Sequence, residues 1–316
     1  MAKQKSIKIH FPVECLKDKI KDLFEVVVSK DTHRNNIEYG LNRGLKLFQS
    51  DAIIAEAAFI SEGPDDDSVY RHTIGIYANY LQFVWMLSYV AFTDHLVSLQ
   101  ILNGINTEKN IQVLRTSQNV YDEAQNMLKA SVVDGLMKAM PGKMYRFPNP
   151  VTQRDVWTDK IDTITIAAAA FILQHEYGHF ELQHDDRTPK YELDADEHAI
   201  KHLIKWAKTN NNPEAMVNTI ATGIGLDLIA SAYITPSLRQ TTYPDIDNRI
   251  EIDLGLCEKY SGLVLSPNVY ETLREGAKRW VKVQNIDITT IQHIGNAKDF
   301  LCALKNLLQP YKEKFS

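Results

Sequence analysis

Two histidines and a glutamate in the second half of the chain have the spacing of a metal-binding helix. His175 and His179 lie four residues apart with Glu176 between them, in the pattern HExxH. Residues four apart on an α-helix project from one face, so both imidazoles can bind one cation about 2 Å from each ring nitrogen. The pattern therefore predicts a zinc site with Glu176 beside it as a general base.

The next segment supplies two carboxylates. Thr188 and Pro189 have the residue types of a helix start, and they place Glu192 and Asp196 four residues apart on one face of the helix that follows. Catalytic zinc usually has three protein ligands and an open position, and an outer carboxylate often orients a ligand histidine. We expect Glu192 as the third ligand and Asp196 as the outer partner.

Other third ligands also fit the sequence. Asp185 or Asp186, in the polar link between the two helices, could ligate the ion. A metzincin would require glycine at position 182 and histidine at position 185, where this chain has Leu182 and Asp185. That class is therefore disfavoured. The nearby histidines expected to be exposed or to contact a partner, rather than to ligate, are His184, His198 and His202.

A third polar cluster, TTYPDIDNRI, occupies residues 241–250. Its proline and aspartates predict a loop that leads into a helix. The phenol of Tyr243 and the guanidinium of Arg249 are groups that can stabilise a developing oxyanion in a zinc hydrolase. The alternative is that Tyr243 packs as an ordinary aromatic residue and Arg249 forms a structural ion pair.

The elements that must position these residues are predicted to be mainly α-helical. Apolar residues recur at helical spacing through most of the chain, from Leu45, Phe48, Ile53 and Ala57 onward, and an apolar segment at 161–173 leads into HExxH. Helices are expected to start after Thr188, Asn212 and Ser266, each of which is followed by proline.

Short strands are expected at 6–11 and at 143–147. The second strand would be a small β element near the HExxH helix that receives a substrate backbone by strand addition. The alternative is an irregular linker whose Tyr145 and Phe147 pack on the core. The proline-rich stretch at 141–160 predicts a boundary between a helical N-terminal region, residues 1–140, and a zincin-like metallopeptidase domain, residues 141–316. The N-terminal region would recognise substrate or regulate activity.

Composition narrows the class of protein and its partners. The 316 residues are 44% hydrophobic and carry a net charge of −5, which predicts a globular chain with a protein partner rather than nucleic acid. Three widely spaced cysteines and the absence of a secretory signal predict a cytoplasmic protein. The apolar run at 83–92 is too short to span a membrane, and polar residues interrupt the longer one at 217–234, so no membrane span is expected.

Together the motifs resemble those of known metallopeptidases. HExxH followed by Glu192-x-x-x-Asp196 resembles the gluzincins, and TYPDIDNRI is similar to the Thr-His-Pro…Arg-Ile signature of membrane-associated CAAX-prenyl-protease relatives. Here Tyr243 replaces their histidine and their membrane spans are missing. A cytoplasmic helical chain of this length resembles more closely the Lit phage-exclusion peptidases, bacterial proteins that cleave elongation factor Tu once a phage component is present.

This resemblance covers residues 171–250 and implies a role for each site residue. His175, His179 and Glu192 would bind Zn²⁺, Glu176 would take a proton from the activated water, and Asp196 would accept the outer N–H of a ligand histidine. Tyr243 or Arg249 would bind the oxyanion. It also implies a translation factor as substrate and a phage-derived activator. The alternative function is a metal-stabilised regulatory or binding module, a sensor or toxin partner that hydrolyses no peptide.

Overall fold

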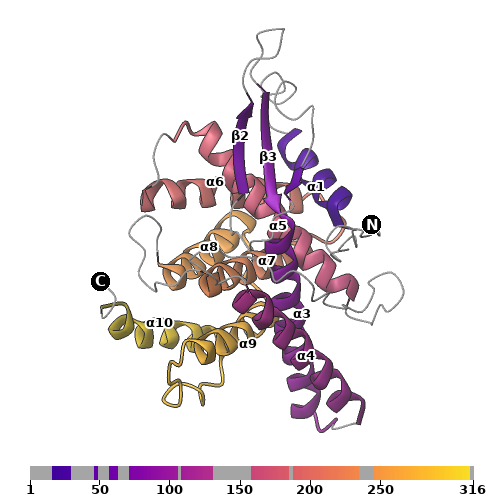
Figure 1. Ribbon diagram of the computed structural model, residues 1–316, viewed down its shortest axis with the longest axis vertical. Helices are drawn as coiled ribbons and strands as arrows, with labels where there is room; N and C mark the ends of the chain where they lie inside the picture. The colour runs from indigo at the N-terminus through magenta and orange to yellow at the C-terminus, as the bar shows by residue number, and fades with distance from the viewer. Residues whose placement is uncertain are drawn as a thin grey trace, which may run out of the picture.

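The computed structural model describes residues 16–29, 46–48, 57–62, 71–105, 108–130, 158–184, 188–234 and 245–313. Helices dominate these residues, which confirms the mainly α prediction (Figure 1). The elements in chain order are α1 (Lys17–Ser29), β1 (Lys46–Phe48), β2 (Ala57–Glu62), β3 (Arg71–Tyr77), α3 (Ala78–Leu102), α4 (Glu108–Ala130), α5 (Thr158–Glu181), α6 (Pro189–Ala207), α7 (Pro213–Ile234), α8 (Ile246–Ser261), α9 (Pro267–Val283) and α10 (Ala297–Glu313).

Helix α5 lies between two hydrophobic clusters. Ile164, Ala167 and Phe171 on one side belong to a cluster built mainly from α6 to α10, whereas Ile161 and Leu173 belong to a cluster with α1, α3 and α4. A helix apolar on all sides is stable only when neighbours cover it completely. The helix that carries HExxH is therefore fixed by both halves of the chain.

Small residues allow α7 to pack closely against α5. A Cβ atom added at Gly223 of α7 would lie 2.8 Å from the backbone nitrogen of Ala168 and from the backbone oxygen of Ile164. Residues 167–170 of α5 are four consecutive alanines, all buried. The two backbones can approach this closely only because neither helix has a large side chain at the contact.

A three-stranded sheet lies beside α5 and continues directly into α3. Its order is β1-β3-β2, with β1 parallel to β3 and β2 antiparallel to it. Strands β2 and β3 pack against α5, above its middle in Figure 1. Residues 46–48 and 57–62 are thus strands, so the helical interpretation of the apolar spacing from Leu45 to Ala57 was wrong there. In so short a segment, the spacing of apolar residues cannot distinguish the 3.6-residue period of a helix from the two-residue period of a strand.

The three predicted helix starts are confirmed. The hydroxyl of Thr188 accepts a hydrogen bond from the backbone nitrogen of Tyr191, and Pro189 opens α6. Asn212 and Ser266 cap α7 and α9 in the same way, each before a proline. The side chain of the capping residue accepts a hydrogen bond from an unpaired backbone N–H of the first turn, and proline has no N–H to satisfy. Because both effects are local, these helix starts can be predicted from the sequence.

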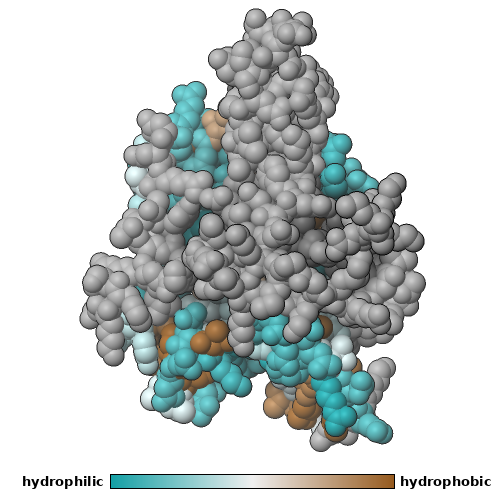
Figure 2. Space-filling model, viewed as in Figure 1, coloured by the Kyte–Doolittle hydropathy of each residue, from teal (hydrophilic) through white to brown (hydrophobic). Residues whose placement is uncertain are grey.

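Within the described ranges, one helix is long and apolar enough to cross a membrane by length and composition. This is α7, and 78% of its most apolar window is buried inside the molecule, as in the core helix of a soluble protein. Among the described residues, four exposed apolar side chains gather at the turn between α3 and α4, namely Ile101, Leu102, Ile105 and Ile111. Brown atoms mark this tip at the lower right of Figure 2.

Several predicted features lie outside the described residues. These are the strands at 6–11 and 143–147 and the boundary near residue 140. The division into residues 1–140 and 141–316 therefore stays a prediction.

We expect Gly223→Ala to lower the free energy of unfolding by about 1–3 kcal/mol, because the new methyl group meets backbone atoms that cannot move aside. The matched control is Gly255→Ala on α8, where the added Cβ has no neighbour within 4 Å. That substitution should stabilise the protein by about 0.5–1 kcal/mol through helix propensity. Urea unfolding measures both values, and equal effects of the two substitutions would contradict the packing argument.

Candidate metal centre

The contact between α5 and α6 depends on the glycine inside HExxH. A Cβ at Gly178 would lie 3.3 Å from the backbone oxygen of Ala195 and 3.2 Å from the ring of His198, both on α6. Contacts this short are tighter than most side chains tolerate, so glycine lets the two helices approach. The chain reverses between them through Gln183, whose φ of 56° is left-handed. The first turn of α6 is thereby brought against the last turns of α5.

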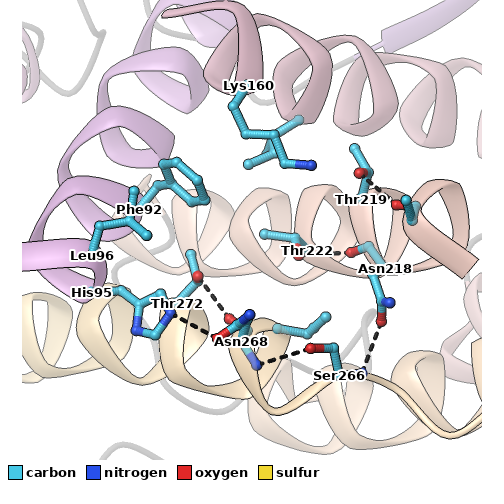
Figure 3. Close-up of a pocket in the computed structure, with 13 residues that line it drawn as sticks. Phe92, His95, Leu96, Lys160, Asn218, Thr219, Thr222, Ser266, Asn268 and Thr272 are labelled. Carbon is cyan, nitrogen blue, oxygen red and sulfur yellow. Dashed lines mark hydrogen bonds between the residues drawn. The ribbon is translucent and has the colours of Figure 1, made fainter. Parts of the chain in front are cut away.

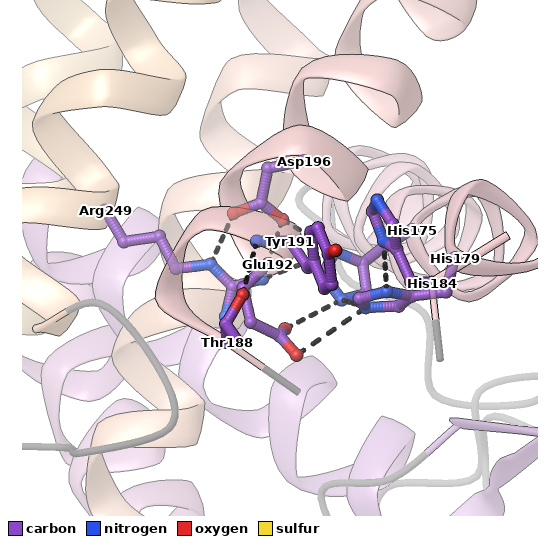
Figure 4. Close-up of polar contacts among 8 residues, drawn as sticks. All are labelled: His175, His179, His184, Thr188, Tyr191, Glu192, Asp196 and Arg249. Carbon is purple, nitrogen blue, oxygen red and sulfur yellow. Dashed lines mark hydrogen bonds and ion pairs between the residues drawn. The ribbon is translucent and has the colours of Figure 1, made fainter. Parts of the chain in front are cut away.

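Three ligand-type side chains converge at this contact (Figure 4). His175 Nε2 lies 3.1 Å from His179 Nε2 and 3.1 Å from Glu192 Oε2, and His179 Nε2 lies 3.6 Å from Glu192 Oε1. Ligand atoms about 2 Å from a tetrahedral cation are about 3.3 Å from one another. The three side chains could therefore bind one metal ion with little movement.

The environment of Glu192 also fits a bound cation. Its side chain is only 1% exposed, and among the residues that the structure describes neither carboxylate oxygen has a partner in hydrogen-bonding geometry. A buried carboxylate without donors is unfavourable unless a positive charge compensates it. Burial alone would raise the pKa of Glu192, but the two facing imidazoles outweigh it and lower the pKa well below its usual value. The group therefore stays charged and available to a metal ion.

A buried ion pair orients one of the histidines. Asp196 Oδ1 lies 2.7 Å from His175 Nδ1, and the same carboxylate receives Arg249 Nε at 2.5 Å and Arg249 Nη2 at 2.6 Å. Burial opposes the charge on Asp196, but Arg249 and His175 lower its pKa. Burial would lower the pKa of His175, but Asp196 and Glu192 raise it to about 10. The arrangement turns Nε2 of His175 toward Glu192 and away from Arg249.

The second histidine has an outer partner that sequence analysis missed. His184 Nδ1 lies 2.9 Å from His179 Nδ1, and the His184 ring stacks on Tyr191 with ring centroids 4.2 Å apart. Burial and the neighbouring His179 lower the pKa of His184, which favours its neutral, accepting form. His184 was expected to be exposed. Its position after the left-handed turn folds it back onto α5, an effect that residue type alone does not signal.

Of the remaining predicted site residues, the structure describes some and not others. Glu176 lies half-buried on α5 next to His175. Arg249 contacts Asp196 and lies on the outer side of His175, so its observed partner is that carboxylate. This is the structural ion pair considered as the alternative to an oxyanion role. Tyr243 and the alternative ligands Asp185 and Asp186 lie outside the described residues.

Two further acids are buried behind Arg249, and sequence analysis did not single them out as site residues. Asp253 is fully buried and has no hydrogen-bond partner among the described residues, and burial raises its pKa well above the usual value. Asp227 accepts a hydrogen bond from Tyr80, with oxygen atoms 2.6 Å apart, and burial raises its pKa to about 7. The charge of Arg249 is therefore balanced chiefly by Asp196, the carboxylate that it contacts.

A separate pocket of about 280 Å³ lies near the other end of α5 (Figure 3). Lys160 and Ile164 of α5 line it together with polar residues of α7 and α9, among them Asn218, Thr222 and Asn268. Fifteen residues of helix separate Lys160 from His175, or about 22 Å along the helix axis. The pocket is therefore distinct from the His175–His179–Glu192 group.

One protein-family model matches the part of the chain that contains the His175–His179–Glu192 group. The family model described as Peptidase U49 matches residues 74–258, which is more than half of the chain. The matched segment includes the three clustered ligand residues, their outer partners and Arg249. No curated protein and no solved structure gives a significant match.

We expect Asp196→Asn to weaken the binding of Zn²⁺ by about 10- to 100-fold, because an amide holds the ligand imidazole less firmly and attracts the cation less. Competition with a fluorescent zinc chelator measures the dissociation constant, and circular dichroism confirms folding. Asp194→Asn, on the same helix, is the control and should leave the affinity unchanged. Equal affinities for the wild type and Asp196→Asn would contradict the role given to this carboxylate.

Asp227 should make stability depend on pH. An exposed aspartate has a pKa of about 3.9, so between about pH 4 and pH 7 the folded state binds a proton that the unfolded state has lost. The free energy of unfolding therefore falls as the pH rises through this window. Relative to the wild type, Asp227→Asn should gain stability between pH 4 and pH 8, by at most about 4 kcal/mol. Urea unfolding of both proteins at pH 4 and pH 8 tests this prediction. A stability difference between the variant and the wild type that does not change with pH would contradict it.

Proposed function

This chain belongs to the peptidase U49 family, and we propose that it is a zinc-dependent endopeptidase whose metal is bound by His175, His179 and Glu192. The observation that carries the proposal is the set of mutual distances among the three ligand atoms, 3.1, 3.1 and 3.6 Å. They meet at the buried carboxylate of Glu192, to which the described part of the chain supplies no other hydrogen-bond donor. A His₂Glu set leaves a fourth position open, as hydrolytic zinc requires.

The chemistry follows from the residues around that position. Zn²⁺, when bound, polarises the scissile carbonyl and makes a water molecule nucleophilic near neutral pH. Glu176 accepts the proton of the attacking water and passes it to the leaving amine. Asp196 and Arg249 keep His175 in the tautomer that presents Nε2. Tyr243 is the group that we assign to the oxyanion, and Arg249 is the second choice because Asp196 already engages it.

The sheet offers a route for binding an extended peptide. Within the described part of the chain, β2 pairs with β3 on one side only, and both strands pack against α5. An unpaired strand edge beside an active-site helix can bind a substrate backbone by strand addition. We propose this edge, together with the predicted segment 143–147, as the substrate-binding border.

We propose a cytoplasmic protein as the substrate, specifically a translation factor such as elongation factor Tu, cleaved in defence against phage infection. This part rests on the motif resemblance to the Lit peptidases, which belong to the U49 family. It includes a phage-derived peptide or protein as activator. A protease of this kind must stay inactive in the uninfected cell, which is the reason for expecting an activator.

Glu176→Gln should keep about one equivalent of zinc in the His175–His179–Glu192 site and abolish peptide cleavage, because the amide cannot accept a proton. Glu214→Gln, at an exposed position in the first turn of α7, is the matched control and should retain full activity. Metal content is measured by mass spectrometry after dialysis. Full cleavage by the Glu176 variant would refute the mechanism.

The substrate is identified by comparing protein fragments in bacterial lysates treated with the wild type or with Glu176→Gln, with and without phage lysate. One site-specific fragment that depends on the wild type and on phage material is the expected result. If zinc binds but no fragment forms under any condition, the metal-stabilised binding module becomes the better description.

A further inference from the structure

A second group of ligand-type side chains lies on another flank of the α5–α6 contact. Glu181 at the end of α5 and His198 and His202 on α6 each present a ligand atom within 4.8 Å of the other two. His198 Nε2 lies 2.6 Å from Glu181 Oε2, and the two imidazole rings stack with centroids 4.3 Å apart. All three side chains are partly buried, so the group remains open to solvent on one side.

The helix geometry explains why these residues meet. His198 and His202 are four apart on α6, so they share one face, which lies roughly 100° around the helix from Glu192. Gly178 leaves space for the His198 ring, whose Nδ1 would lie 3.2 Å from a Cβ added at that position. The same glycine that brings Glu192 to HExxH thus brings His198 to the last turn of α5.

We propose that Glu181, His198 and His202 form a second site for a divalent transition metal, with Zn²⁺ as its natural occupant. The donor set is two imidazoles and one carboxylate, which is the donor chemistry of the first cluster and suits zinc or a neighbouring ion. The rings lie nearly parallel, at 23°, so binding requires one imidazole to turn about its side-chain bonds. Three protein ligands leave one position of the ion open, and Glu197, the acid next to His198 in the chain, already contacts Lys259 and Tyr260. We therefore assign the ion a positioning role.

The ion would act as a clamp between two helices. Glu181 lies two residues beyond His179 on α5, and His198 lies two residues beyond Asp196 on α6. A metal bridging them would fix the distance between the helices that carry the first cluster. Its role is therefore positional, and its binding can be measured without any activity assay.

The test is zinc stoichiometry of the full-length protein, dialysed against buffered micromolar Zn²⁺ and analysed by mass spectrometry. The wild type should bind about two equivalents, His198→Ala about one, and the double variant His175→Ala/His179→Ala about one. His293→Ala, which removes an exposed histidine outside both clusters, is the matched control and should bind about two. Glu181→Gln replaces His198→Ala if the latter fails to fold.

Two results would overturn the proposal. In the first, the wild type binds a single equivalent of zinc, and the His175→Ala/His179→Ala variant binds none. The other is a folded His198→Ala or Glu181→Gln variant that still binds two equivalents, which would mean adventitious binding elsewhere. Neither result affects the first cluster, so failure of this proposal is distinguishable from failure of the proposed peptidase function.

Discussion

Asp196 is the residue on which the organisation of the site depends. Its buried carboxylate contacts His175 from α5 and Arg249 from α8 while belonging to α6, so a single side chain connects three helices. A buried charge without a partner is strongly destabilising, and here two partners share the charge of Asp196. The orientation of the first ligand histidine is therefore part of the stability of the fold. The geometry of the candidate metal site and the packing of the helices therefore depend on the same contact.

Helix α5 gives this contact a rigid base. It lies between two hydrophobic clusters, with alanines facing Gly223 of α7 on one side and larger residues facing α3 on the other. Sites placed on well-packed helices keep their ligand geometry better than sites placed on loops. The ligand atoms already have the mutual distances that a tetrahedral ion imposes, so binding requires little reorganisation.

The sequence predicted those features that depend on local rules. HExxH identified a helix face, and Thr188, Asn212 and Ser266 identified helix starts, because i to i+4 spacing and capping operate within one element. The strands at 46–48 and 57–62 were misread because their pairing with β3 is a tertiary effect. His184 and the Glu181–His198–His202 group were missed for the same kind of reason. Their contacts arise only when a left-handed turn and Gly178 bring α6 against α5.

The buried carboxylates impose an electroneutrality condition on the interior. Glu192, Asp196 and the neighbouring Glu176 carry three negative charges, and Arg249 offsets one of them. If the imidazoles are neutral, an excess of two negative charges remains. A divalent ion cancels this excess, whereas a monovalent one leaves half of it. Without a metal, protons are the available substitute, and the pKa of about 10 for His175 reflects this. Binding of a divalent ion at this cluster would therefore displace protons from the histidines.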